Sequence, residues 1–163
     1  MREISAERIA GAYRRVLRRG SRITPTSPAE DLHDLRKRCK ELRYLLEIFA
    51  PVLDPDGARA AVKELKVLQD VLGRFQDSEA QREAIYALAA DMMAKGDVEV
   101  RTILAMGEIA AQQQEAMRTA RAEFAVAFAS FGRLPVARRL ARLTPAPAGA
   151  AVPAGTPTAG AAR

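Results

Sequence analysis

Residues 27–50 read SPAEDLHDLRKRCKELRYLLEIFA, and the spacing of their apolar side chains indicates an amphipathic helix. Six apolar residues recur at alternating intervals of three and four, which places them on one side of that helix: Leu32, Leu35, Cys39, Leu42, Leu46 and Phe49. Ser27 followed by Pro28 and Glu30 predicts a capped start. Pro51 predicts that the helix ends near Ala50.

The same helix has a second, basic face within an arc of about 120°. Its members are His33, Arg36, Lys37, Lys40, Arg43, Tyr44 and Glu47. Like charges three or four residues apart destabilise an isolated helix by about 0.2–0.5 kcal/mol per pair. Either carboxylates from elsewhere in the chain or a bound anion must therefore offset the repulsion.

Two neighbouring segments repeat this arrangement. Ser5 and Gly20 bound a predicted first helix, and its arginines share an arc of about 140°: Arg8, Arg14, Arg15, Arg18 and Arg19. Lys63 and Lys66 lie off the apolar side of a third helix, predicted to begin at Asp54-Pro55. If the three helices are neighbours, their basic stripes line one groove. Such a groove suits a flexible chain of phosphates, since Arg and Lys donate to phosphate oxygens and His33 and Tyr44 add donors.

Glycines and capping patterns divide the rest of the chain. Gly73 is predicted to end the third helix in a left-handed cap, and Ser78 to begin a fourth that ends near Gly96. A fifth helix is predicted from Asp97 to Gly132. Apolar residues recur in it every seven positions, which is typical of a bundle seam: Ile103, Ala110, Met117, Phe124 and Phe131.

The fold class that follows is all-α, an antiparallel bundle of four to five long helices. Aromatic residues are only 5% of the chain, so strand formers are scarce. The helical domain is assigned to residues 1–143, with a short basic helix at 135–143. Residues 144–163 are mostly Ala, Pro, Gly and Thr, and we expect a disordered tail there.

The net charge of +6 is unevenly placed. Residues 1–43 contain 12 Lys/Arg and 6 Asp/Glu, whereas residues 44–131 contain 9 and 14. Such a concentrated field favours an anionic partner. The single Cys39 excludes an intramolecular disulfide and indicates a reducing compartment. No apolar run approaches the roughly 20 residues needed to cross a bilayer, so we expect a cytoplasmic protein with no membrane partner.

Catalysis, metals and cofactors are not expected. One histidine and one cysteine cannot build a common metal site, and phosphoryl transfer needs clustered acids that the basic face lacks. Asp70 and Asp77 are interpreted as caps or partners of an arginine. Three alternatives stay open: a nucleic-acid-binding module, a phosphate-chemistry enzyme or its accessory domain, and a scaffold that contacts acidic protein surfaces.

Residues 32–47, LHDLRKRCKELRYLLE, resemble the signature of CHAD domains, the conserved-histidine α-helical domains. The matching positions are His33, Arg36, Lys40, Arg43 and Tyr44. Residues 65–73, LKVLQDVLG, followed by Asp77, are similar to that family's second block, and the similarity extends over about residues 5–130.

This resemblance implies a helical module that binds inorganic polyphosphate, often on polyphosphate granules and often fused to a triphosphate-tunnel (CYTH) domain. Complete members are internal duplications, and one copy, similar to the C-terminal one, is visible here. We therefore expect a groove that is incomplete or completed by a second chain, as a homodimer. The expected ligand-binding residues are His33, Arg36, Lys37, Lys40, Arg43 and Tyr44, flanked by Arg14, Arg15, Arg18, Arg19, Lys63 and Lys66.

Overall fold

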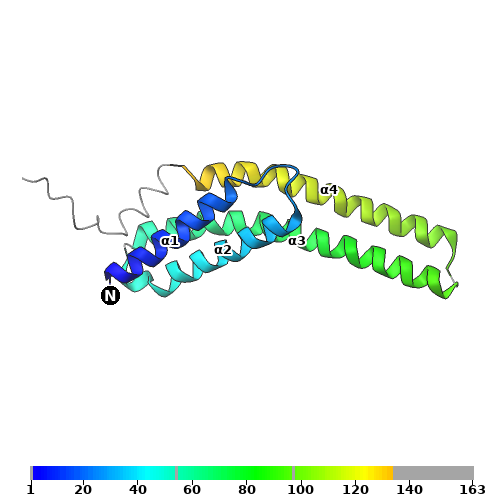
Figure 1. The fold of residues 1–163 in the computed structure, drawn as a ribbon, viewed down its shortest axis with the longest axis horizontal. Helices are drawn as coiled ribbons and strands as arrows, with labels where there is room; N and C mark the ends of the chain where they lie inside the picture. The colour runs from blue at the N-terminus through cyan, green and yellow to red at the C-terminus, as the bar shows by residue number, and fades with distance from the viewer. Residues whose placement is uncertain (1, 54, 97, 134–163) are drawn as a thin grey trace, which may run out of the picture.

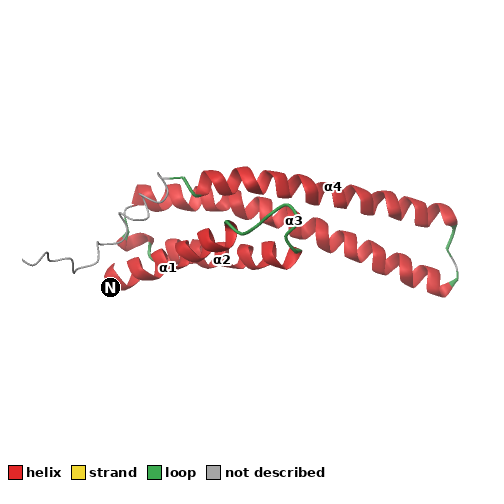
Figure 2. Cartoon of the chain, turned by 45° about the horizontal axis from the view of Figure 1, so that its top comes forward, coloured by secondary structure: helices red, strands yellow, loops and turns green. Residues whose placement is uncertain are grey.

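The computed structural model describes residues 2–53, 55–96 and 98–133. The elements are α1 (Arg2–Gly20), α2 (Ala29–Ile48), the short 3-10 helix η1 (Ala50–Val52), α3 (Pro55–Lys95) and α4 (Val100–Phe131), shown in Figure 1. No strand occurs within the described ranges (Figure 2), which confirms the all-α prediction. The predicted basic helix at 135–143 and the tail from 144 onward lie outside the described residues.

The core lies where α1 and α2 pack against the first half of α3 and the last half of α4 (Figure 1). Five of the six apolar residues predicted for the α2 core face are fully buried, and Phe49 is half-buried at the end of the helix. The seam predicted in α4 is also confirmed from Ala110 through Phe131, whereas Ile103 is only half-buried. The apolar spacing of the sequence thus locates the core correctly.

One predicted break is wrong, because α3 runs without interruption for 41 residues. Gly73 and Ser78 both lie inside it, so neither a cap at Gly73 nor a helix start at Ser78 exists. A glycine inside a helix costs only about 1 kcal/mol relative to alanine. Leu72 and Phe75 are fully buried on either side, and their packing outweighs that cost. The left-handed cap occurs instead at Gly96, where φ is 73°. Because α3 ends at Lys95, the helix end predicted near Gly96 is confirmed.

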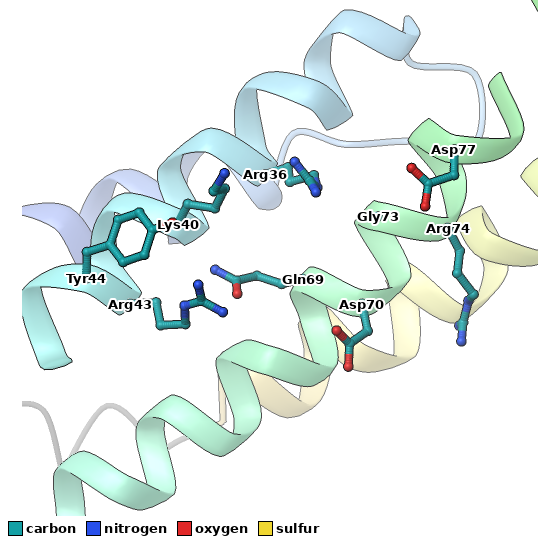
Figure 3. Close-up of a pocket in the computed structure, with 9 residues that line it drawn as sticks. All are labelled: Arg36, Lys40, Arg43, Tyr44, Gln69, Asp70, Gly73, Arg74 and Asp77. Atoms are coloured by element: carbon teal, nitrogen blue, oxygen red, sulfur yellow. The ribbon is translucent and has the colours of Figure 1, made fainter. Parts of the chain in front are cut away.

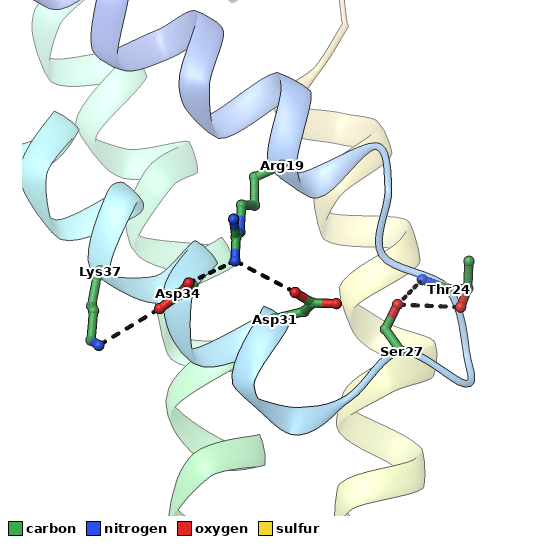
Figure 4. Close-up of polar contacts among 6 residues, drawn as sticks. All are labelled: Arg19, Thr24, Ser27, Asp31, Asp34 and Lys37. Atoms are coloured by element: carbon green, nitrogen blue, oxygen red, sulfur yellow. Dashed lines mark hydrogen bonds and ion pairs between the residues drawn. The ribbon is translucent and has the colours of Figure 1, made fainter.

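Two predicted caps and one helix start also differ from the structure. Ser5 is buried inside α1, which begins at Arg2. The Ser27 hydroxyl accepts a hydrogen bond from the backbone N–H of Thr24 at 2.9 Å, so α2 begins after Pro28 without a side-chain cap (Figure 4). The last helix begins at Val100 and not at Asp97. Short-range hydrogen bonding in the connecting loop therefore replaces the expected capping box.

Gly20 ends α1 as predicted, and it also allows α1 and α4 to approach each other closely. A Cβ atom at this position would collide with the ring of Phe128. The loop that follows Gly20 lies beside α4, since residues of the loop and of α4 line one small hollow. This contact closes the core where α1 ends and α2 begins.

Beyond that closure α3 and α4 continue as a projecting helical hairpin (Figure 1). We call residues 80–95 of α3 and 100–114 of α4 the arm, and the rest of the described chain the body. None of the described residues between Gln76 and Lys95 is fully buried, and in the arm α3 lies beside α4 and away from α1 and α2 (Figure 1). Long as they are, the helices of the described chain include none apolar enough to cross a membrane.

Candidate functional site

A groove of about 510 Å³ lies between α2 and α3 (Figure 3). Its lining residues are Arg36, Lys40, Arg43 and Tyr44 from α2, and Gln69, Asp70, Gly73, Arg74 and Asp77 from α3. Packing of α2 positions its four members. Because Leu35, Cys39 and Leu42 point into the core, the residues that follow them turn toward the flank that borders α3.

The α2 side of the groove presents cations that have few partners. Arg36 and Lys40 form no ion pair with another described residue. Nε of Arg43 lies 3.6 Å from Oε1 of Glu47, beyond hydrogen-bond distance. The same Nε is buried and has no hydrogen-bond partner among the described residues. Tyr44 lies at the rim, with its ring centroid 5.2 Å from the Arg43 guanidinium.

The α3 side contributes another buried donor, Gln69. Its side chain reaches from α3 toward α2 (Figure 3), and the residue is only 9% exposed. Its Nε2 has no hydrogen-bond partner within the described chain. One turn further along α3, a Cβ at Gly73 would lie 3.9 Å from Nε of Arg36, so the glycine leaves the groove floor open. Two buried donors thus face each other across the groove with no acceptor among the described residues.

Two carboxylates, Asp70 and Asp77, also line the groove, and the described residues show neither of the roles that the sequence predicts for them, helix cap or partner of an arginine. Asp70 and Asp77 cannot cap helix ends, because α3 continues through both. Neither forms an ion pair within the described residues. Arg74 belongs only partly to the groove, since its guanidinium is paired with Glu123 of α4. The excess positive charge therefore comes from α2.

The predicted arginines of α1 lie at a different place, which we call the α1–α2 edge. Arg15 pairs with Glu41 at 2.6 Å, and Arg19 pairs with Asp34 at 2.6 Å and with Asp31 at 3.5 Å (Figure 4). Partial burial would raise the pKa of Glu41, but hydrogen bonds and charge from Arg15 and Arg38 outweigh it, so the pKa is lowered overall. At 100° per residue, Asp34 and Glu41 lie about 140–160° from Arg36 around α2. The edge and the groove are therefore on opposite sides of α2.

The remaining predicted residues do not line the groove. Lys37 lies 3.7 Å from Asp34 (Figure 4), and Arg14 and Arg18 are exposed on α1. His33 is half-buried one turn before Arg36 on the same side of α2. Lys63 and Lys66 border a separate, more apolar depression of about 480 Å³ beside Leu46 and Val62. Of the twelve predicted residues, the structure brings four together: Arg36, Lys40, Arg43 and Tyr44.

Gln69 was missed by the sequence prediction, although the sequence contains a signal for it. It sits beside the apolar row Leu65, Leu68 and Leu72, where a polar residue is unusual.

Two further observations concern the Cys39 thiol and metal binding. Burial raises the pKa of the Cys39 thiol to about 12. In the part of the chain that the structure describes, no group of three His, Cys, Asp or Glu side chains is placed to hold a metal ion.

Comparison with known proteins indicates the family to which the chain and its groove belong. No curated protein matches the chain. The family model described as the CHAD domain matches residues 1–86, more than half of the chain. The matched range covers α1, α2 and all of the residues of α3 that line the groove. The expected resemblance is thereby confirmed, and the chain belongs to the CHAD domain family.

Proposed function

We propose that this chain is a non-enzymatic module that binds inorganic polyphosphate in the groove between α2 and α3. Membership of the CHAD domain family supports a phosphate-rich ligand. The groove supplies cations of two kinds: the guanidinium groups of Arg36 and Arg43 offer forked donors, and Lys40 offers a point charge. Such a ligand would also bring the protein to polyphosphate granules.

The observation that carries the proposal is the pair of unsatisfied donors, Nε of Arg43 and Nε2 of Gln69. A buried donor without an acceptor costs about 1–3 kcal/mol. Once the two side chains turn toward the opening of the groove, a phosphate oxygen between α2 and α3 would accept from both donors while Arg36 and Lys40 neutralise its charge. Because neighbouring phosphates in the polymer repeat the same acceptors, the ligand can extend along the face of α2 toward Tyr44 and, in the other direction, His33.

The α2 positions also explain why an extended ligand is favoured over a single phosphate ion. Arg36 and Tyr44 are eight residues apart, which corresponds to about 12 Å along the helix axis. The groove is open along this length, and its volume of about 510 Å³ is within the usual range for ligand sites. A linear polymer would contact the cations in succession, whereas one phosphate ion would reach only some of them.

The test is a filter-binding titration with polyphosphate of defined lengths at fixed salt. The groove variant carries Arg36→Ala, Lys40→Ala and Arg43→Ala. Loss of three charge-assisted contacts is expected to weaken binding at least about 100-fold. The matched control removes the same charge from exposed positions outside the groove, with Arg14→Ala, Arg18→Ala and Arg22→Ala. It is expected to weaken binding less than about 10-fold, with helicity by circular dichroism unchanged in both variants.

Equal losses in both variants would reject the groove and indicate non-specific attraction by net charge. Competition with single-stranded RNA at equal phosphate concentration tests the nucleic-acid alternative, which requires RNA to displace polyphosphate. Release of phosphate from the polymer with magnesium or manganese present would instead indicate an enzyme, and we expect none.

A further inference from the structure

We propose that the arm is a dimerisation surface, and that two copies of this chain pair arm to arm to form a four-helix bundle. The proposal rests on apolar residues that the body covers at one end of α3 and α4 and leaves open at the other. It is independent of the proposed ligand. It also concerns mainly the region after residue 86, where the match to the CHAD domain model ends.

One row of residues on α3 shows this change from covered to open. Leu72, Glu79, Tyr86 and Met93 recur every seven residues and so lie along one side of the helix. Leu72 is fully buried in the body and Glu79 is half-buried at its edge. Further along the row, Tyr86 and Met93 are exposed in the arm.

A matching row runs along α4. Arg121, Gln114, Gly107 and Val100 recur every seven residues, and Leu104 lies beside them. Arg121 borders the hollow beneath the loop that follows α1, and its guanidinium lies 4.7 Å from the ring centroid of Phe75. In the arm, Val100 is 76% exposed and Leu104 is 64% exposed. The covered end of this row is therefore again in the body.

Contacts between the helices show that both rows lie on the same side of the hairpin. Arg82 of α3 is hydrogen-bonded to Gln114 of α4, which belongs to the second row. Arg82 lies four residues before Tyr86, and positions four apart share one helix face. Tyr86, Met93, Val100 and Leu104 consequently form one apolar patch, which we call the arm face. It continues the surface on which α1 and α2 pack in the body.

The opposite side of the hairpin provides a comparison. Arg74 and Glu123 pair across it, and Leu88 and Ile109 lie two heptads from these two residues. They are the only large hydrophobic residues exposed on that side of the arm within the described ranges. Four large apolar residues on one side against two on the other identify the arm face as the side that needs a cover.

A second copy of the chain fits this requirement. What covers the same surface in the body is a pair of antiparallel helices, α1 and α2, and the arm is itself a pair of antiparallel helices, somewhat shorter than these two. About 15 residues per helix give an arm about 22 Å long and about 20 Å wide, so a symmetric pair buries on the order of 1,000 Å². Two-fold symmetry places each arm face on the other.

The charges of the arm do not oppose this pairing. Lys95 pairs with Asp91 at 2.6 Å, and Arg101 pairs with Glu99 at 3.1 Å. The arm as a whole contains three Lys/Arg and three Asp/Glu, so two arms can approach without a strong net repulsion. The basic residues of the groove lie in the body, away from the proposed contact.

The test is the mass of the full chain in solution, measured by light scattering after size exclusion over a concentration series. We expect a dimer for the wild type and a monomer for Met93→Glu with Leu104→Glu on the arm face. Leu88→Glu with Ile109→Glu introduces the same charge on the opposite side and is expected to leave the dimer intact. All four side chains are exposed, so the monomer fold should tolerate each change, which circular dichroism verifies.

A wild type that stays monomeric up to about 0.1 mM would overturn the proposal and assign the arm face to another protein or to the residues after 133. A dimer that survives the arm-face variant, or one that the control variant also dissociates, would overturn it as well. Polyphosphate binding per chain is expected to persist in both arm variants. Failure of the dimer and failure of the proposed ligand are therefore distinguishable.

Discussion

The two sides of α2 are alike in sequence and different in structure. On the α1–α2 edge, Arg15 and Arg19 each meet a carboxylate at 2.6 Å. On the groove side, Arg36 and Lys40 meet none within the described residues, and two nearby donors lack acceptors. The difference shows that a run of basic residues identifies a binding site only after the carboxylates opposite it have been located.

The positions of the acidic residues around α2 explain why its two sides differ. Asp31, Asp34 and Glu41 all lie on the side that faces α1. They pair with arginines of α1 and so do not reach Arg36 and Lys40, which form no ion pair with any described residue. Charge is thus segregated around α2: one side is paired with α1, and the other carries the basic residues to which we assign the proposed ligand.

The largest expected difference between the two sides is in ligand binding. Arg15→Ala with Arg19→Ala should change the dissociation constant for polyphosphate less than about 3-fold, whereas the groove variant loses at least about 100-fold. The edge variant should instead lower the free energy of unfolding by about 1 kcal/mol, since exposed ion pairs contribute little each. Urea denaturation and filter binding on the same preparations measure both. A large loss of affinity in the edge variant would show that the two sides of α2 do not differ in ligand binding.

A smaller effect is expected from the carboxylates inside the groove. Asp70→Asn with Asp77→Asn preserves shape and removes two negative charges that repel a polyanion. Binding should tighten about 3–10-fold at low salt and less at about 0.15 M, where charges more than about 8 Å apart are screened. Titrations at two salt concentrations provide the measurement. Weaker binding would show that these carboxylates hold the basic residues, or a bridging cation, in place.

The smallest effect concerns Gly73, at the floor of the groove. Gly73→Ala should raise the free energy of unfolding by about 0.5–1 kcal/mol, because alanine favours the interior of a helix and its Cβ meets only Nε of Arg36, at 3.9 Å. Thermal or urea denaturation checks this. A destabilised variant would contradict the continuous helix and favour the left-handed cap that the sequence predicted.

Much of the fold follows from residue spacing alone. The apolar positions of α2 and the seven-residue seam of α4 predict the core because burial dominates their energetics. The break at Gly73 is predicted wrongly because a local preference of about 1 kcal/mol is weaker than the burial of Leu72 and Phe75. The local signal is correct at Gly96, where φ is positive and a Cβ would meet no atom within 4 Å, whereas it fails at the Ser27 cap and at the predicted helix start at Asp97.

The candidate site is predictable only in part. The sequence identifies the cations of α2, because a helix fixes which of its residues share a face. It does not identify the partner of Arg15 or Arg19, since pairing depends on the register between α1 and α2. Gln69 was missed for the same reason, because its importance comes from the α2 donors across the groove and not from its own segment.

The uninterrupted course of α3 has a mechanical consequence. Gly73 lies in the groove and Leu88 lies in the middle of the arm, and the helix between them is continuous over about 22 Å. This part of α3 is therefore a rigid connection between groove and arm. In an arm-to-arm dimer, two such connections would hold two grooves roughly 45 Å apart and pointing in fixed directions. Such a bivalent spacer would tie separate polymer strands together, or grip one long strand twice and release it more slowly than either groove alone.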